Sequence, residues 1–130
     1  PTTTPKTSSA ASDVYKTQVL GMAAEFKDDG VAVNALWPRT AIATAAVKSV
    51  LGGEQLVNIS RGPEIMADAA YVILTKPSKE FSGNFCIDDT LLAENGVSDF
   101  SVYADVPFDQ LAPDFFVPED MPPPEAAKKS

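Results

Sequence analysis

A nearly unbroken apolar run from Val31 to Leu36 is the most regular hydrophobic feature of the sequence. Small and β-branched residues fill it, with Asn34 as its one polar position, so it predicts a strand buried on both faces of a parallel sheet. Pro38 follows and ends the strand, because proline has no N–H to donate to a neighbour. Thr40 and Thr44 come just beyond the carboxyl end of the strand, where open α/β sheets bind their ligands. The pattern therefore predicts a strand that leads into a ligand-site loop.

Two longer stretches have the three-to-four-residue hydrophobic repeat of an amphipathic helix. The first runs from about Ser12 to Lys27, and the second runs from Pro63 to Thr75. Their repeating apolar residues are Val19, Met22, Ala23 and Phe26 in the first, and Ile65, Ala69, Val72 and Ile73 in the second. Each helix therefore has one apolar stripe that needs a packing partner.

A second short strand is predicted from Phe81 to Asp88, after the second helix. Strand, helix and strand in this order form one right-handed crossover unit with two parallel strands. The adjacent acids Asp88 and Asp89 would point to opposite faces of a strand, so we expect no metal pair there. Shorter elements are also expected: a brief helix at 44–51, a helical turn at 91–96 and a weak edge strand at 100–106.

The chain has a formal net charge of −8, no histidine and one cysteine. An acidic surface argues against a nucleic acid or an anionic membrane as partner, since both bind basic surfaces. The lack of histidine removes the commonest general base and metal ligand. Cys86 alone can form neither an internal disulfide nor a cysteine-based zinc site, and its apolar neighbours predict a buried thiol. No apolar stretch approaches the roughly 18 residues of a membrane span.

The two ends of the chain differ in composition from the segment between them. Residues 1–11 are rich in Ser and Thr and are expected to form a flexible extension, either a disordered tail or the processed end of an organelle-targeting leader. The chain begins at Pro1 rather than Met, so we expect processing or truncation there. The domain then covers residues 12–106. Residues 107–130 form a proline-rich acidic tail, which should be extended and poorly ordered after Pro122 unless a partner holds it.

Five segments resemble the C-terminal part of the short-chain dehydrogenase/reductase family, in the same order. They are LGMAAEF at Leu20–Phe26, NALWPRTAIATAA at Asn34–Ala46, PEIMADAAYVILTKP at Pro63–Pro77, FSGNFCIDD at Phe81–Asp89 and LAPDFF at Leu111–Phe116. In that family, five strands precede this part of the chain. The resemblance therefore implies an α/β, incomplete Rossmann-like fold. We expect the C-terminal portion of a doubly wound parallel sheet, with about two parallel strands, flanking helices and an extended tail.

In the resembling family, the loop after this strand meets the nicotinamide cofactor. The resemblance implies that Pro38 turns the chain and that the backbone of Ile42 bonds the carboxamide. It also implies that Thr40 and Thr44 lie near the cofactor phosphates. These four residues are cofactor-binding candidates by resemblance only, and they are vestigial if no cofactor binds. The threonines have a second interpretation, in which they cap the loop and the start of a short helix. Arg39 stands where the wider family commonly has glycine.

The helix of that family which matches Ser12–Lys27 carries Tyr-x-x-x-Lys, the proton donor and its partner. The aligned positions here are Ser8 and Ser12. Tyr15 and Lys16 are adjacent, so their side chains point about 100° apart on a helix and cannot form that pair. The sequence contains no Tyr-x-x-x-Lys and no glycine-rich turn between a strand and a helix. We therefore expect no catalytic residue and no cofactor held by this chain alone, with NAD(P) only if another chain completes the fold.

Two strands and their helices would leave a sheet edge and apolar faces uncovered, so we expect obligate protein partners. Phe26, Phe115 and Phe116 are the predicted partner-binding residues, because aromatic anchors commonly dominate interfaces. We predict a non-catalytic structural subunit, derived from a short-chain dehydrogenase and packed in a larger, mitochondrial assembly. The alternative is the C-terminal part of an NAD(P)-dependent oxidoreductase of this family, completed by another chain. A third possibility is a small binding module that uses the threonine loop for another ligand.

Overall fold

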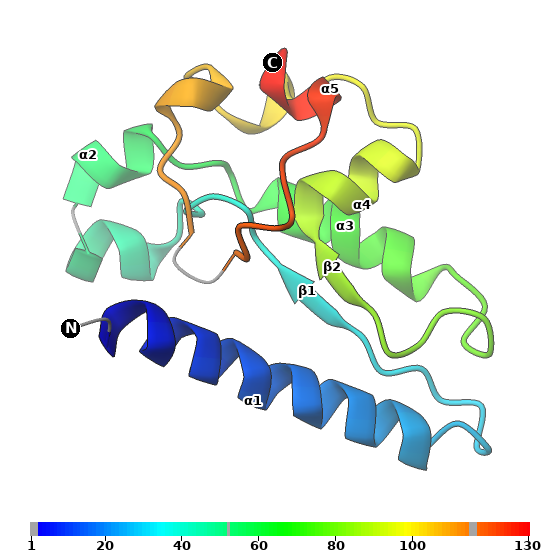
Figure 1. Cartoon of the computed structure of the whole chain (residues 1–130). Helices are drawn as coiled ribbons and strands as arrows, with labels where there is room; N and C mark the ends of the chain where they lie inside the picture. Colours follow the sequence, from blue (N-terminus) through cyan, green and yellow to red (C-terminus); the bar gives the residue numbers. More distant parts are fainter. Residues whose placement is uncertain (1–2, 52, 115–116) are drawn as a thin grey trace.

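Two short parallel strands form the centre of the computed structural model, which describes residues 3–51, 53–114 and 117–130 (Figure 1). Strand β1 is Ala35–Trp37 and strand β2 is Phe85–Ile87. They pair in parallel, with Ala35 opposite Phe85 and Trp37 opposite Ile87. The predicted α/β class and the parallel strand pair are confirmed.

Helices and helical turns surround the two strands. They are α1 (Thr3–Glu25), the π-helical turn η1 (Val47–Leu51), α2 (Gly53–Asn58), α3 (Glu64–Leu74), α4 (Asp88–Glu94), the 3-10 turns η2 (Ser101–Tyr103) and η3 (Phe108–Gln110), and α5 (Glu125–Lys128). In Figure 1, α1 runs along the bottom of the molecule, whereas α3 and α4 lie to the right of the strands. The second predicted helix is thus confirmed as α3.

Both strands are shorter than their apolar runs, because side chains take over the backbone bonding at their start. The Asn34 side-chain oxygen accepts a hydrogen bond from the backbone N–H of Asn84 at 3.0 Å. The Ser82 hydroxyl accepts one from the N–H of Val33, also at 3.0 Å. Gly83 has a φ of 75°, which favours glycine and is incompatible with a regular strand. The ladder therefore starts only after these residues.

The core lies between α3, α4 and the C-terminal part of the chain. Its buried apolar residues are Ile65, Ala69, Cys86, Leu91, Leu92, Phe100, Tyr103 and Ala127. The thiol of Cys86 is buried, as predicted, and burial is the main reason why its pKa is raised. This core covers β2 and leaves α1 on the other side of β1.

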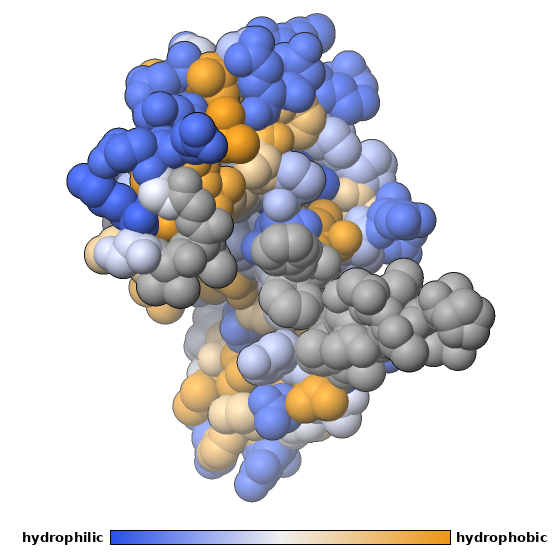
Figure 2. All heavy atoms as spheres, turned by 90° about the vertical axis from the view of Figure 1, so that its left-hand side faces the viewer, coloured by the Kyte–Doolittle hydropathy of each residue, from blue (hydrophilic) through white to orange (hydrophobic). Residues whose placement is uncertain are grey.

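Helix α1 begins earlier than the sequence predicted. It starts at Thr3 rather than near Ser12, so residues 3–11 are helical. Pro5 falls in the first turn, where a missing N–H costs no helical hydrogen bond. Among its apolar side chains, Tyr15 is 54 % exposed and Leu20 is 52 % exposed. Figure 2 shows orange apolar patches among blue polar ones on the lower part of the molecule, where α1 lies.

The C-terminal tail is docked onto the domain, so the prediction of a poorly ordered segment after Pro122 is wrong. Ala127 in α5 is fully buried against the core. The Ser130 hydroxyl accepts a hydrogen bond from the backbone N–H of Phe100 at 2.9 Å. Pro124 precedes α5 with a φ of −69°, a value that proline favours at the start of a helix. A small residue that fits the core and a proline that starts a helix together order this end.

Two smaller predictions also need correction, and one short helix was not predicted. Residues 100–106 contain the 3-10 turn η2 instead of an edge strand, because the Asp99 carboxylate accepts a hydrogen bond from the N–H of Ser101 at 2.9 Å. The predicted second strand ends at Ile87, since Asp88 already begins α4. Gly53, with a φ of 61°, starts the short helix α2, which the sequence did not indicate. None of the described helices is long and apolar enough to span a membrane.

Candidate functional site

The loop after β1 is held by two neighbouring segments of backbone. Thr40 pairs with Pro113 in an antiparallel bridge, and Ile42 pairs with Arg61 in a parallel one. The Ala41 N–H donates to the carbonyl of residue 112 at 2.8 Å, and the Ala41 carbonyl accepts from the Arg61 N–H at 3.0 Å. Two isolated bridges therefore hold the loop just beyond the carboxyl end of β1.

The four cofactor-binding candidates occupy different environments in this loop. Pro38 is half-buried, and Thr40 is 2 % exposed with its hydroxyl donating to the Ala41 carbonyl at 3.1 Å. Thr44 is exposed, and its hydroxyl accepts a hydrogen bond from the N–H of Val47 at 3.3 Å. In this chain the Thr44 hydroxyl bonds the first turn of the helical segment that follows, and Thr40 is buried within the loop.

The fourth candidate, Ile42, turns its own backbone away from the segment that holds the loop. Its neighbours Ala41 and Ala43 make the hydrogen bonds to Arg61, at 3.0 and 2.8 Å. In a parallel bridge of this kind the central residue directs its N–H and C=O to the opposite side. The Ile42 carbonyl accepts from the Thr44 N–H at 2.8 Å. The Ile42 N–H thus faces away from Arg61.

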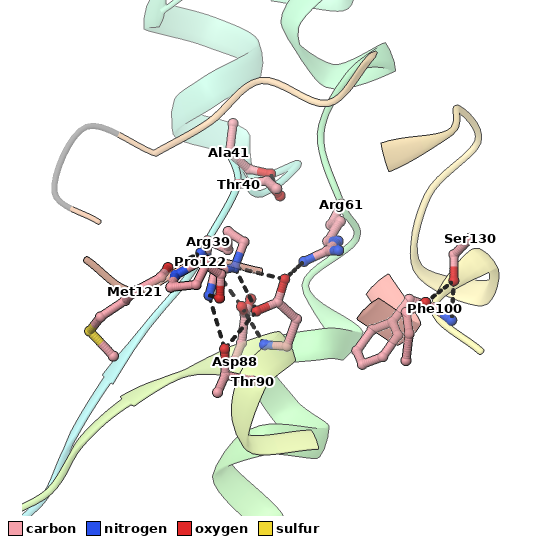
Figure 3. Close-up of polar contacts among 12 residues, drawn as sticks. Arg39, Thr40, Ala41, Arg61, Asp88, Thr90, Phe100, Met121, Pro122 and Ser130 are labelled. Atoms are coloured by element: carbon pink, nitrogen blue, oxygen red, sulfur yellow. Dashed lines mark hydrogen bonds and ion pairs between the residues drawn. The ribbon is translucent and has the colours of Figure 1, made fainter. Parts of the chain in front are cut away.

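A buried cluster of four charged side chains lies beneath this loop (Figure 3), and the sequence reasoning missed it. Arg39, Arg61, Asp88 and Asp89 are 6 %, 1 %, 0 % and 0 % exposed. Arg39 Nε donates to both carboxylate oxygens of Asp89, at 2.7 and 2.9 Å, and Arg61 Nη1 donates to Asp89 Oδ2 at 3.0 Å. Two arginines thus share one carboxylate. This gives each buried arginine a partner of opposite charge, without which its burial would be strongly destabilising.

The expectation that Asp88 and Asp89 point to opposite faces of a strand is therefore wrong. Both residues lie in the first turn of α4, and both carboxylates turn into the interior. A signal was present in the sequence, since Arg39 comes after Pro38 at the end of one apolar strand and the two acids follow the other strand. Parallel strands bring their carboxyl ends to the same edge of the sheet, and this places Arg39 near Asp88 and Asp89.

The two carboxylates differ in their surroundings. Asp88 Oδ1 accepts hydrogen bonds from the backbone N–H groups of Arg39 and Asp89, at 3.1 and 2.7 Å. Asp88 Oδ2 is buried and has no hydrogen-bond partner among the described residues. Burial, and then the neighbouring charge of Asp89, raise the pKa of Asp88 to about 6. The site therefore holds one firmly paired carboxylate and one that gains a proton more readily than an ordinary aspartate.

Aromatic side chains complete the surroundings of Arg61. Its guanidinium carbon lies 5.7 Å from the ring centre of Phe100 and 5.5 Å from that of Phe108. Nearby, the Tyr103 hydroxyl donates to Asp68 Oδ2 at 2.6 Å, and burial together with this bond raises the pKa of Tyr103 to about 12. Asp68 is exposed and accepts this bond.

Two open grooves adjoin the segment that contains β1. One has a volume of about 590 Å³ and is lined by Tyr15, Val19 and Met22 of α1 together with Leu36, Trp37 and Pro38. The other, of about 490 Å³, is lined by Val31, Val33, Ile73 and Leu74 among others. Asn34 lines both grooves. Mostly apolar surface therefore borders this segment in two places.

The adjacent residues Tyr15 and Lys16 contact different partners. The Tyr15 ring lies 5.8 Å from the ring of Trp37, whereas Lys16 Nζ lies over the ring of Phe85 at 5.7 Å, so the two side chains serve separate contacts. No group of His, Cys, Asp or Glu among the described residues could hold a metal ion. Of the predicted partner-binding residues, Phe26 is half-buried within the chain, and Phe115 and Phe116 lie outside the described residues.

Known proteins resemble this chain over most of its length. No family model matches it. Hydroxysteroid dehydrogenase-like protein 2 of Bos taurus is 56 % identical over 101 residues, which are 78 % of this chain and 23 % of the relative. The protein of the same name from Homo sapiens is 53 % identical over 111 residues, which are 85 % of this chain and 25 % of the relative. The chain thus spans about a quarter of the length of these curated relatives.

Solved structures give the same result for the fold. A short-chain dehydrogenase from Mycobacterium thermoresistibile matches with a TM-score of 0.70 and 48 % identity, covering 83 % of this chain and 38 % of that one. A protein from Xanthomonas campestris described as a dehydrogenase matches with a TM-score of 0.70 and 49 % identity, over 80 % of this chain and 38 % of that one. The resemblance and the partial, Rossmann-like fold predicted from the sequence are confirmed.

Proposed function

We propose that this chain, which corresponds in sequence and in fold to the C-terminal part of a short-chain dehydrogenase, is a non-catalytic part that completes a larger dehydrogenase-like sheet. Its partner is a second polypeptide segment that adds a strand beside β1. The observation that carries this proposal is the second edge of β1. Among the described residues, β1 pairs with β2 alone, so its other edge has no strand neighbour.

An uncovered edge of this kind favours the addition of a strand. Strands that lie inside a parallel sheet are buried on both sides, and an open edge is a template for pairing with another chain. The two grooves next to residues 31–38 supply apolar surface beside that edge. A strand with apolar residues on both faces would gain backbone hydrogen bonds from the edge and side-chain burial from the grooves.

Helix α1 supports the same conclusion, because it is held only loosely by its own chain. Val14, Tyr15, Leu20 and Met22 are each about half exposed, at 56 %, 54 %, 52 % and 46 %. Burying one such side chain contributes roughly 1.5–3 kcal/mol. An added strand, with the elements that follow it, would cover part of this surface and stabilise α1 against the sheet.

The lack of the catalytic dyad supports a non-catalytic role. The sequence has no Tyr-x-x-x-Lys, and the structure separates Tyr15 from Lys16. Loss of a general acid and its partner lowers a rate by several orders of magnitude. The chain can thus contribute sheet, loop and core to an assembly without contributing the proton transfer.

Co-expression tests this proposal. The chain would be co-expressed with the part of the Mycobacterium thermoresistibile dehydrogenase that it does not match. We expect a one-to-one complex by native mass spectrometry, in which the backbone amides of Ala35–Trp37 gain protection from hydrogen exchange. A chain that is monomeric, folds cooperatively alone and leaves these amides unprotected in the mixture would contradict the proposal.

A second candidate function is supported by the backbone of Ile42. Its N–H faces away from the segment that holds the loop, as the nicotinamide-binding loop of the resembling family requires. In this function the chain is the C-terminal part of an NAD(P)-dependent oxidoreductase, and another chain supplies the phosphate-binding turn and the proton donor. The same complex distinguishes the two: turnover of NAD(P)H with a carbonyl substrate supports the second function, and cofactor binding without turnover supports the first.

A further inference from the structure

Arg39 contacts the C-terminal tail at Asp114 and again at Met121 and Pro122, and Figure 3 shows the second of these contacts. Its backbone carbonyl accepts a hydrogen bond from the Asp114 N–H at 2.9 Å. Its guanidinium donates to the carbonyls of Met121 and Pro122, at 2.7 and 3.3 Å. Arg39 therefore binds the tail both at Asp114 and at residues 121–122.

The orientation of this guanidinium is set from the other side by α4. Arg39 Nε is bound to Asp89, and Nη2 donates to the Thr90 hydroxyl at 2.9 Å. A planar guanidinium held at Nε points its outer nitrogens in fixed directions, which a lysine ammonium cannot reproduce. Nη1 and Nη2 are consequently directed at the carbonyls of Met121 and Pro122.

The part of the tail that Arg39 holds lies over the carboxyl ends of both strands. We call residues 117–122 the strap. Its Pro118 and Met121 line, with Trp37, Phe85 and Ile87, a small pocket of about 20 Å³. A space of this size has room for little more than one water molecule. The strap thus fills the place where open α/β sheets bind their ligands.

The segment that follows the strap depends on it for position. Helix α5 places Ala127 in the core, and the Ser130 carbonyl accepts a hydrogen bond from the Phe108 N–H at 3.2 Å. The strap precedes α5 in the chain and is bound to the loop after β1 through Arg39. Fixing Met121 and Pro122 therefore also restricts where α5 can dock.

We propose that the strap is a closure over the carboxyl end of the sheet and that Arg39 is the clasp which holds it shut. Release of the guanidinium from the two tail carbonyls opens the strap, uncovers the part of Trp37 that lines the small pocket and loosens α5. The packing of α3 against α4 does not include these two bonds, so it is disturbed less than the docking of α5, whose Ala127 belongs to the same core. This closure belongs to the chain itself and does not depend on the identity of a partner.

The test uses the full 130-residue chain and its single tryptophan, Trp37, which lines the covered pocket. The variants are Arg39→Met, Arg39→Lys and, as a matched control, Lys48→Met, which breaks only the exposed ion pair with Glu54. With Arg39→Met we expect acrylamide quenching of Trp37 to rise and amide exchange in residues 125–130 to become roughly tenfold faster or more, since buried charge-assisted bonds are lost. Arg39→Lys should lie between the wild type and Arg39→Met, and Lys48→Met should match the wild type.

Exchange of the α3 amides separates a clasp from a general core residue. Arg39→Met also breaks the buried pair with Asp89 and so destabilises the whole chain, but the α3 amides should lose less protection than those of residues 125–130. An equal loss of protection in α3 and in the tail would overturn the proposal, as would an unchanged tail. If Arg39→Met does not fold, Thr90→Val removes one acceptor of the guanidinium without leaving a buried charge unpaired. Thr90→Val should raise exchange in residues 125–130 more than in α3, and equal changes in both would again contradict the clasp.

Discussion

Arg39 Nε lies 2.7 Å from Asp89 Oδ1, and both side chains are almost completely buried. The bond joins the loop after β1 to the first turn of α4, across fifty positions of sequence. Arg61 binds the other oxygen of the same carboxylate at 3.0 Å. This single carboxylate therefore ties together the ends of both strands and the segment before α3.

Replacing Asp89 should be among the most destabilising single changes in the chain. Asp89→Asn leaves two buried arginines without their shared carboxylate, and breaking a buried ion pair in this way costs about 3–5 kcal/mol of unfolding free energy. Urea denaturation of the full chain measures the change, at a concentration where its oligomeric state is known.

The matched control is Glu54→Gln, which removes an exposed ion pair with Lys48 at 3.2 Å. Exposed pairs contribute about 0–1 kcal/mol, so this control should unfold almost as the wild type does. Equal losses in the two variants would mean that the buried cluster contributes no more than a surface pair.

Asp88 should make the stability of the chain fall as the pH rises from about 4 to 6. Its pKa is about 6 in the folded chain and 3.8 as an ordinary aspartate, so the folded state binds the proton more tightly. The stabilisation is fully present below the lower value and is lost as the pH passes the higher one, by roughly 3 kcal/mol at most. The charges that act on it are those of Asp89 and Arg61, and the backbone N–H of Arg39 donates a hydrogen bond to it.

Asp88→Asn tests this dependence, because asparagine keeps an oxygen for the two backbone N–H groups but does not titrate. Unfolding free energies between pH 4.5 and pH 7.5 should decline less steeply in the variant than in the wild type. Parallel curves for the two proteins would assign the pH dependence to other groups.

Ala127 should tolerate no larger side chain, because it is fully buried in the core through α5. Ala127→Leu overpacks that site and should cost about 1–3 kcal/mol of unfolding free energy. Ala45→Leu, at an exposed position, is the size-matched control and should have little effect. An unaffected Ala127→Leu variant would indicate that α5 does not dock in solution.

Met22 should contribute to association with the proposed partner segment, since it lines the groove between α1 and β1. Met22→Ser should weaken the co-expressed complex by about 1–3 kcal/mol, the value of one buried apolar side chain. Val102→Ser changes another exposed apolar residue, outside both grooves, and serves as the control. Dissociation constants from titration calorimetry report both, and equal affinities would place the interface elsewhere.

Much of the fold was determined by local sequence pattern. The apolar run at 31–36 and the helical repeat at 63–75 appear in the structure as β1 and α3, although with shorter bounds. Such patterns suffice because burial on one or both faces of an element is written into consecutive residues. The family resemblance added the order of the elements and the position of the loop after β1, including Pro38 and Ile42.

The sequence failed where contacts join distant residues or where a weak local signal has two outcomes. Asp88 and Asp89 were interpreted as the end of a strand, because nothing local distinguishes that from the first turn of a helix. The proline-rich tail reads as extended by composition, yet one small residue, Ala127, fits the core and orders it.

The sequence by itself thus determined which segments are apolar, which are helical and which dehydrogenase part they resemble. Only the tertiary structure decided that Arg39 meets Asp89 and the tail carbonyls. The physical reason is that a buried charge is stable only when partners from separate segments surround it, and those partners are brought together by packing rather than by any local repeat. The same packing leaves one edge of β1 without a strand among the described residues, a feature that no local pattern encodes.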